Sequence, residues 1–215
     1  MNQVELCNLA LSRIGHGASK PVQSLDEGGE SANACKRVFP SAMASLLREY
    51  EWPFARRCAA LALSAETVEG WEYAYAYPDN CAFLLAVGPS GSDATRMPAK
   101  SMRCAFGLVA AADGESLLVA ANIPDALAWY TVSVTNPHFG DALFQDALAW
   151  RVAGELALAL KADPKMAQNA GLQYELALSK ALSAVGNEDG LRDAEWNAPA
   201  DRLTQAYGSE THPWL

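Results

Sequence analysis

The chain has 215 residues, of which 51% are hydrophobic and 19% charged, and its formal net charge is -9. This apolar fraction is enough for a hydrophobic core, which argues against wholesale disorder. The acidic balance disfavours a protein that reads nucleic-acid sequence, because such a chain repels phosphate backbones at long range. A protein that sits near DNA without binding it remains allowed.

The five cysteines include no Cys-x-x-Cys motif, and their number is odd. This pattern is typical of reduced, mostly buried thiols in a cytosol. The N-terminal residues lack the basic-then-apolar order of a signal peptide, and no run approaches the ~18 apolar residues of a membrane span. We therefore expect a soluble protein that is made and kept inside a cell.

Two amphipathic helices are predicted in the first quarter of the chain. Asn2 begins a capping box, which predicts a helix over about 2–15. A second apolar stripe with helical spacing covers about 31–51. Pro40 lies within this stripe and predicts a bend or a break there. Pro53 ends the second helix, because the residue before a proline is disfavoured in the α region.

The middle of the chain, about residues 56–135, changes to the period-two alternation of strands. Its aromatic residues at positions 71, 73, 75 and 77 alternate with smaller or charged residues, which predicts a strand with one aromatic face. Asp113-Gly114 is a hairpin turn signal between two apolar runs. The segment therefore reads as a small, mainly antiparallel β unit.

Two further helices are predicted after the β unit. Residues 139–162 are apolar over most of a helical circumference, so this helix is expected to be central. Asp163-Pro164 is a strong N-cap and first-turn pair for a helix over 164–186. Residues 188–215 are polar and aperiodic, and we expect a flexible C-terminal tail.

The order of these elements predicts a mainly α fold: a four-helix bundle-like core with a small antiparallel β unit inserted between helices 2 and 3. Residues 1–187 then form a single domain, because the four helices can share one core.

The sequence contains no constellation typical of an enzyme. The histidines, His16, His138 and His212, lie far apart and outside any helical metal-binding motif. No phosphate-binding glycine loop is present, and Gly88 to Ser92 only superficially resembles a nucleophile elbow. The cysteines lie in apolar stripes or strands, which favours inert thiols. We therefore predict no catalytic residues, no cofactor and no metal.

Several aromatic and cationic side chains are candidates for an interface. The tyrosine face could stack bases or sugars, but without a basic groove a core or subunit interface is the stronger interpretation. The arginines around position 50 lie beside Glu49 and Glu51, so local ion pairing and docking of an acidic partner are equally open. The candidate interface residues are Arg48, Arg56, Arg57, Tyr73, Tyr75, Trp196 and Trp214.

The stretch from Arg48 to Arg57 is predicted to join the helices to the β unit. The stripe of the second helix runs up to Tyr50, so Trp52 and Phe54 continue it into the core. Pro53 then turns the chain towards the first strand.

Four ordered stretches over about residues 3–185 resemble the tail tubular protein A family of podovirus-type phages and prophages, the head-to-tail adaptors. They are Ala10-Leu-Ser-Arg-Ile-Gly15 with Ser24-Leu-Asp-Glu27; Phe39-Pro40 with Leu46-Leu47-Arg48 and Trp52-Pro-Phe-Ala-Arg56; Trp71-Glu-Tyr-Ala-Tyr75 with Tyr77-Pro-Asp79 and Cys81; and Tyr130, Phe139 and Phe144 leading to Ala149-Trp-Arg-Val-Ala153 and Glu155-Leu-Ala157. Each motif alone is short, and the ordered set is more specific.

The resemblance implies a structural protein of the virion neck, made in the bacterial host cytoplasm, and not an enzyme. Such adaptors are helix bundles with a β insertion that form a ring, usually twelve-fold, beneath the portal protein. The ring extends the DNA channel, lets DNA pass without sequence-specific binding, and docks the downstream tail (nozzle) protein. It allows the isolated chain to be a monomer, because such rings often close only on the portal.

Two other classes of function stay open. One is a hydrolase that uses an unrecognised carboxylate pair. A deep cleft lined by Glu and Asp would favour it. The other is a helical regulatory scaffold that binds a host protein. A flat, exposed apolar rim on the β unit would favour the adaptor.

Overall fold

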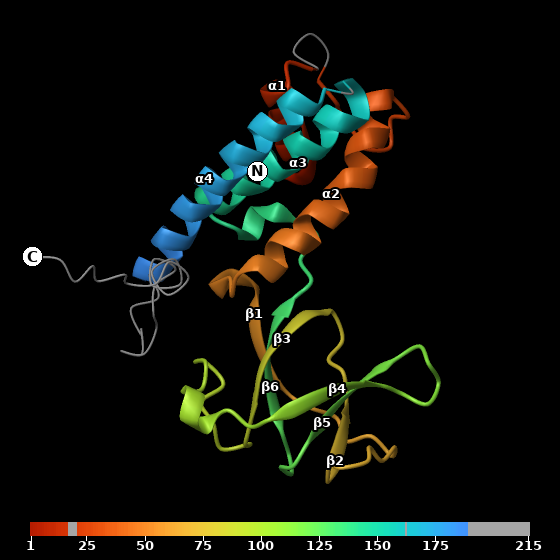
Figure 1. Cartoon of the computed structure of the whole chain (residues 1–215), viewed down its shortest axis with the longest axis vertical. Coiled ribbons are helices and arrows are strands. Elements are labelled where there is room, and N and C mark those ends of the chain that lie inside the picture. The colour runs from red at the N-terminus through yellow and green to blue at the C-terminus, as the bar shows by residue number, and fades with distance from the viewer. Residues whose placement is uncertain (17–20, 162, 189–215) are drawn as a thin grey trace, which may run out of the picture.

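The computed structural model describes residues 1–16, 21–161 and 163–188. Figure 1 shows a helical body at one end of the molecule and a β unit at the other. The chain is 46% helical and 19% strand, with two three-stranded antiparallel sheets, so the fold is mixed α/β. The prediction of a mainly α protein with a small β insertion is therefore wrong. The prediction fails because the two sheets pack against each other and form a hydrophobic core of their own, separate from the core of the helices.

Four helices form the body: α1 (Gln3–Arg13), α2 (Glu30–Glu49), α3 (Ala142–Leu156) and α4 (Pro164–Glu188). The capping box predicted at Asn2 is confirmed, because its side chain accepts from the Glu5 amide while the Glu5 carboxylate accepts from the Asn2 amide. Asp163 caps α4 as predicted, through bonds from the amides of Lys165 and Met166. No described helix combines the length and apolar character needed to cross a bilayer.

The central helix of the body is α3, which packs against each of the other three helices. Its residues Leu148, Val152 and Leu156 are fully buried, as the broad apolar circumference predicts. The chain then continues as a π-helical segment, Ala157–Lys161, before α4 returns along α3.

Pro40 does not break α2, which runs continuously from Glu30 to Glu49. Of the bend or break predicted there, the break does not occur. The proline lies on the solvent-exposed side of the helix. The carbonyl that it leaves without an amide partner can therefore be solvated, which lowers the cost of an interior proline.

The β unit (residues 56–132) consists of two sheets. Sheet A has the strand order β1 (Arg56–Ala60), β6 (Leu127–Val132), β3 (Cys81–Gly88), and sheet B has the order β2 (Tyr73–Ala76), β5 (Leu117–Ala121), β4 (Phe106–Ala110). The predicted Asp113-Gly114 turn joins β4 to β5, and Gly114 adopts a φ of +71° that favours glycine.

The two sheets are joined along two seams. At the first, Leu63 pairs with Tyr75, and the amide of Ser64 donates to the Ala74 carbonyl, so the chain after β1 continues alongside β2. At the second, Val87 of β3 pairs with Cys104, just before β4. Among the described residues this second seam has no other ladder bond, so β3 and β4 diverge beyond it. The result is a small barrel that is open between β3 and β4.

Candidate functional site: the joint and the apolar rim

The joint between body and β unit is built on Trp52. Its side chain is 1% exposed, and the indole Nε1 donates to the Leu46 carbonyl at 2.9 Å, at the end of α2. The ring meets Phe144 of α3 edge-on, with centroids 4.8 Å apart. Pro53 then begins a 3-10 turn that leads into β1. The prediction that Trp52 belongs to the core is confirmed.

The three arginines of the joint bind within the chain. Arg48 donates from Nη1 to the Ala82 carbonyl of β3 at 3.0 Å, and its guanidinium lies 5.2 Å from the Phe83 ring centroid. Arg56 forms a 2.9 Å ion pair with Glu51, which is the local pairing that the sequence left open. Arg48 thus fixes the end of α2 to β3, and the body and the β unit are tied together at this point.

Arg57 is the exposed arginine of the joint and donates to the carbonyl of Arg56. It also lines a shallow pocket of about 240 Å³, together with Phe54, Phe139 and residues 132–136. The lining of this pocket combines apolar side chains, two hydroxyls, the Asn136 amide and the Arg57 guanidinium, and it contains no carboxylate. The pocket therefore lacks the paired acids on which the hydrolase alternative rests.

The two candidate tyrosines differ in exposure. Tyr75 is 1% exposed and its hydroxyl donates to the Ile123 carbonyl at 2.5 Å, so it belongs to the core between the sheets and presents no surface for a partner. Tyr73 is half-buried and stacks on Tyr75 with centroids 6.3 Å apart. The predicted single aromatic face is also too simple, because the intervening Ala74 is buried too. Trp196 and Trp214 lie outside the described residues.

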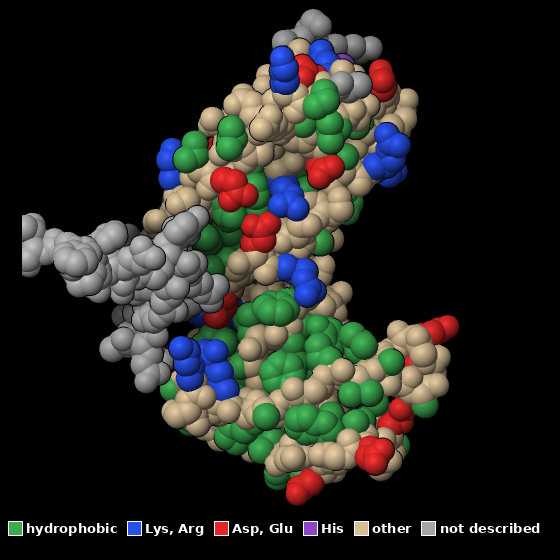
Figure 2. Space-filling model, viewed as in Figure 1, with side chains coloured by type: hydrophobic (Ala, Val, Ile, Leu, Met, Phe, Trp, Pro, Cys, Tyr) green, Lys and Arg blue, Asp and Glu red, His purple; other side chains and the backbone are tan. Residues whose placement is uncertain are grey.

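Large apolar side chains lie exposed around the β unit, and we call them the apolar rim. Leu63 is 67% exposed, Leu108 is 49% exposed and Leu117 is 45% exposed. The rim consists of Leu63, Phe83, Met102, Leu108, Val109 and Leu117. Figure 2 shows hydrophobic side chains spread across one face of this unit. Clustered exposed apolar residues mark interaction sites more often than single ones do.

Charges of opposite sign lie at the two ends of the rim. The acidic end combines the β4–β5 turn with the segment before β2, joined where Glu66 accepts from the Ala112 amide at 2.9 Å. The exposed acids of the acidic end are Glu66, Glu69, Glu72, Asp113 and Glu115, and the basic end carries Arg96, Lys100 and Arg103, with Asp93 paired to Arg96 at 3.9 Å. Figure 2 shows Lys and Arg at one end of the β unit and Asp and Glu at the other.

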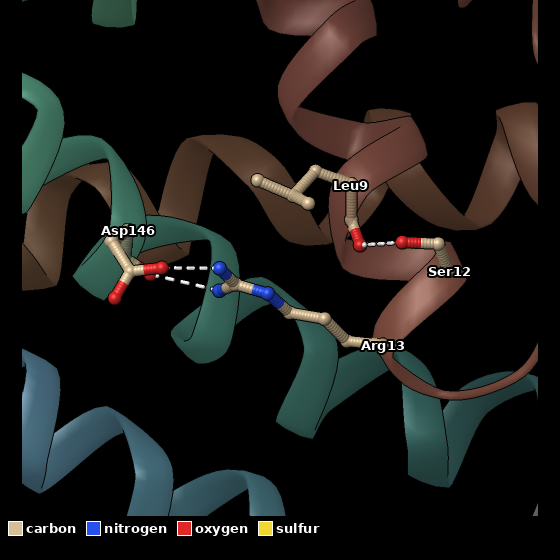
Figure 3. Close-up of polar contacts among 4 residues, drawn as sticks. All are labelled: Leu9, Ser12, Arg13 and Asp146. Atoms are coloured by element: carbon tan, nitrogen blue, oxygen red, sulfur yellow. Dashed lines mark hydrogen bonds and ion pairs between the residues drawn. The ribbon is translucent and has the colours of Figure 1, made fainter.

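Polar contacts in the helical body have a structural character. Arg13 of α1 donates from Nη1 to the Asp146 carbonyl at 3.0 Å and from Nη2 to the Asp146 carboxylate of α3 (Figure 3). Its guanidinium also lies 4.2 Å from the Trp150 ring centroid. The Ser12 hydroxyl beside it donates back to the Leu9 carbonyl. The two bonds from Arg13 hold α1 on α3, and the Ser12 bond stays within α1.

A second polar cluster joins three helices near the joint. Arg151 of α3 forms a 3.0 Å ion pair with Glu49 of α2, and its guanidinium lies 5.1 Å from the Tyr174 ring centroid on α4. Burial, followed by the neighbouring Glu49 carboxylate, raises the pKa of the Tyr174 hydroxyl. The phenol therefore stays neutral, and the contacts of Arg151 connect α2, α3 and α4.

The described histidines and cysteines do not converge on a reactive centre. His16 contacts the Ser31 hydroxyl at 3.0 Å, and His138 is exposed near the start of α3. Cys7 and Cys35 are buried in the helical core, where a mutual hydrogen bond and burial raise the pKa of the Cys7 thiol. No group of three potential metal ligands occurs in the part of the chain that the structure describes.

Sequence reasoning missed the apolar rim and the open seam of the barrel. Leu108 and Val109 are neighbours in β4 and point to opposite faces, yet both are exposed. A strand without any alternation between apolar and polar residues is a signal of this kind, but it equally fits a strand that is buried on both faces. Only the exposure of the side chains in the folded structure distinguishes a strand that is exposed on both faces from one that is buried on both faces.

No family model matches this chain, and no curated protein matches it in sequence. The resemblance to the tail tubular protein A family therefore stays a prediction from the motifs.

Proposed function

We propose that this protein is a head-to-tail adaptor of a phage or prophage, a structural subunit that assembles as a ring beneath the portal and docks the tail. The observation that carries the proposal is the apolar rim on the β unit. A unit that exposes Leu63, Leu108 and Leu117 together gains free energy when another protein covers them, at about 25 cal/mol per Å² of apolar area removed from water.

The arrangement of the two parts supports an assembly role. The β unit stands at one end of the helical body, and the joint at Trp52 and Arg48 fixes it there. A rigid joint lets a subunit present two surfaces, the body and the β unit, at a defined angle to two different partners. An adaptor between portal and tail needs two such surfaces.

The charge of the chain fits a protein that lies around a DNA channel. With a formal net charge of -9, a ring of such subunits repels the phosphate backbone and lets DNA slide. The proposal therefore includes passage of DNA without sequence-specific binding, assembly in the bacterial cytoplasm, and a final place in the neck of the virion.

Electron microscopy of the chain mixed with its cognate portal protein tests the proposal. The expected result is an additional ring of density beneath the portal. Portal particles that carry no additional density at high concentrations of both proteins would overturn it.

A matched pair of variants tests the role of the rim. Leu63→Glu places a charge in the rim, and Leu172→Glu places the same charge at a similarly exposed leucine of α4. Both positions are more than half exposed, so both variants are expected to fold. We expect Leu63→Glu to lower portal or tail binding by at least tenfold and Leu172→Glu to leave it unchanged. Equal losses in both variants would show that the rim has no special part.

A further inference from the structure

The shallow pocket beside Arg57 lies where the chain crosses between the helical body and the β unit. The chain enters the β unit through the 3-10 turn Pro53–Ala55 and leaves it through residues 133–141, and both crossings contribute to the lining. The volume of the pocket is about 240 Å³. Because a cavity of about 150 Å³ accommodates a benzene ring, this pocket has room for one aromatic ring and a small polar group.

The floor of the pocket is apolar and is held in place by the helical core. Val132 and Val134 alternate with hydroxyl residues, and both pack against the core of the body. The Phe54 ring meets Phe144 of α3 edge-on, with ring centroids 4.8 Å apart. Phe139, which also lines the pocket, is 60% exposed. A ligand with a ring therefore finds a preformed apolar surface here and covers an exposed aromatic side chain.

The polar side chains of the pocket all offer hydrogen-bond donors. The Arg57 guanidinium uses Nη1 for the carbonyl of the preceding residue, and no carboxylate among the described residues pairs with it. The Asn136 side chain accepts through Oδ1 from the backbone amide two residues later, which leaves its NH₂ group for the pocket. The hydroxyls of Ser133 and Thr135 bond to no residue in the described part of the chain.

This set of donors selects a ligand with anionic oxygens, because it combines one cation with neutral donors and no acid. A guanidinium can hold a carboxylate through two parallel hydrogen bonds. Phosphate would fit the same donors, but the formal net charge of -9 repels a dianion more strongly than a monoanion. The single cation therefore favours a carboxylate, and the apolar floor favours a carboxylate that carries an aromatic ring.

We propose that this pocket binds a small aromatic monocarboxylate, with the carboxylate at Arg57 and the ring on Phe54 and Phe139. Such a ligand contacts both crossings of the chain, so its binding also strengthens the joint between the body and the β unit. The inference rests on the pocket alone. It goes beyond the proposed adaptor and does not depend on it.

An NMR titration of the isotope-labelled full chain with N-acetyltryptophan tests the proposal. We expect saturable binding in the millimolar range, with shifts of the backbone amides of residues 132–136 and of the Arg57 side chain. N-acetyltryptophanamide keeps the ring without the charge, and acetate keeps the charge without the ring, so each should bind at least tenfold more weakly. Shifts that do not saturate, shifts spread over the whole surface, or equal binding of the acid and its amide would overturn the proposal.

Two matched arginine variants locate the site. Arg57→Gln removes the cation of the pocket, and Arg37→Gln removes an exposed arginine of α2 outside it. Both side chains are exposed, so both variants are expected to fold, which far-UV circular dichroism checks. We expect Arg57→Gln to weaken the binding of N-acetyltryptophan at least tenfold, because hydrogen bonds to charged groups are the strong ones, and Arg37→Gln to leave it unchanged. Equal affinity of the two variants would contradict a site at Arg57.

Discussion

Replacing Trp52 by Ala removes a fully buried indole from the point where the helical body meets the β unit. A tryptophan buries about 150–250 Å². At about 25 cal/mol per Å² its removal costs at most about 4–6 kcal/mol, because extended-chain areas are upper bounds. Truncations of this kind in protein cores cost about 3–5 kcal/mol. We therefore expect the free energy of unfolding of Trp52→Ala to fall by about 3–5 kcal/mol.

Urea unfolding followed by far-UV circular dichroism measures this loss. In a chain of this length the melting temperature should also fall, by about 2–4 °C per kcal/mol. Trp52→Phe keeps an edge-on ring against Phe144 but loses the bond to the Leu46 carbonyl, so it should lose less than Trp52→Ala. Trp71→Ala is the matched control, because Trp71 is only half-buried. A Trp52→Ala protein within about 1 kcal/mol of the wild type would refute the place of Trp52 in the core.

Gly140→Ala should destabilise the protein by about 1–3 kcal/mol in the same assay, because an added Cβ would lie 2.3 Å from the Phe144 ring, whereas Gly91→Ala meets nothing within 4 Å and should be neutral. Asp163→Ala removes the N-cap of α4 and should cost about 0.5–2 kcal/mol, and an unchanged unfolding midpoint would argue against the cap. Burial, and then a hydrogen bond with the neighbouring thiol, raises the pKa of Tyr77 to about 12 from an ordinary value of 10.0. Because the folded state holds the Tyr77 proton more tightly than the unfolded state, the contribution of the neutral phenol to the free energy of unfolding is present in full below pH 10. It is lost as the pH rises towards 12, and the free energy of unfolding measured as a function of pH will show this loss.

Features that depend on a few neighbouring residues could be predicted from the sequence. The Asn2 capping box, the Asp163 cap and the Asp113-Gly114 turn all appear where their local patterns place them. Trp52 was also placed correctly, because the stripe of α2 leads directly to it. In each case the signal and the structure lie within one or two turns of chain.

Features that depend on distant partners could not be predicted. In the apolar run of residues 81–87, Leu84 and Val87 belong to the core between the two sheets, whereas Phe83 stays exposed in the rim. Nothing near this run in the sequence indicates two sheets instead of a small hairpin. The different exposure of Tyr73 and Tyr75 likewise depends on distant residues, because the buried Tyr75 hydroxyl donates to the Ile123 carbonyl, 48 residues away in the chain.

The mass of the portal particle before and after addition of this chain tests the adaptor proposal most directly. The proposal predicts a saturable increase by a whole number of 23.0 kDa subunits, equal to the symmetry of the ring that forms. An unchanged portal mass, with this chain remaining free at every concentration, would contradict it.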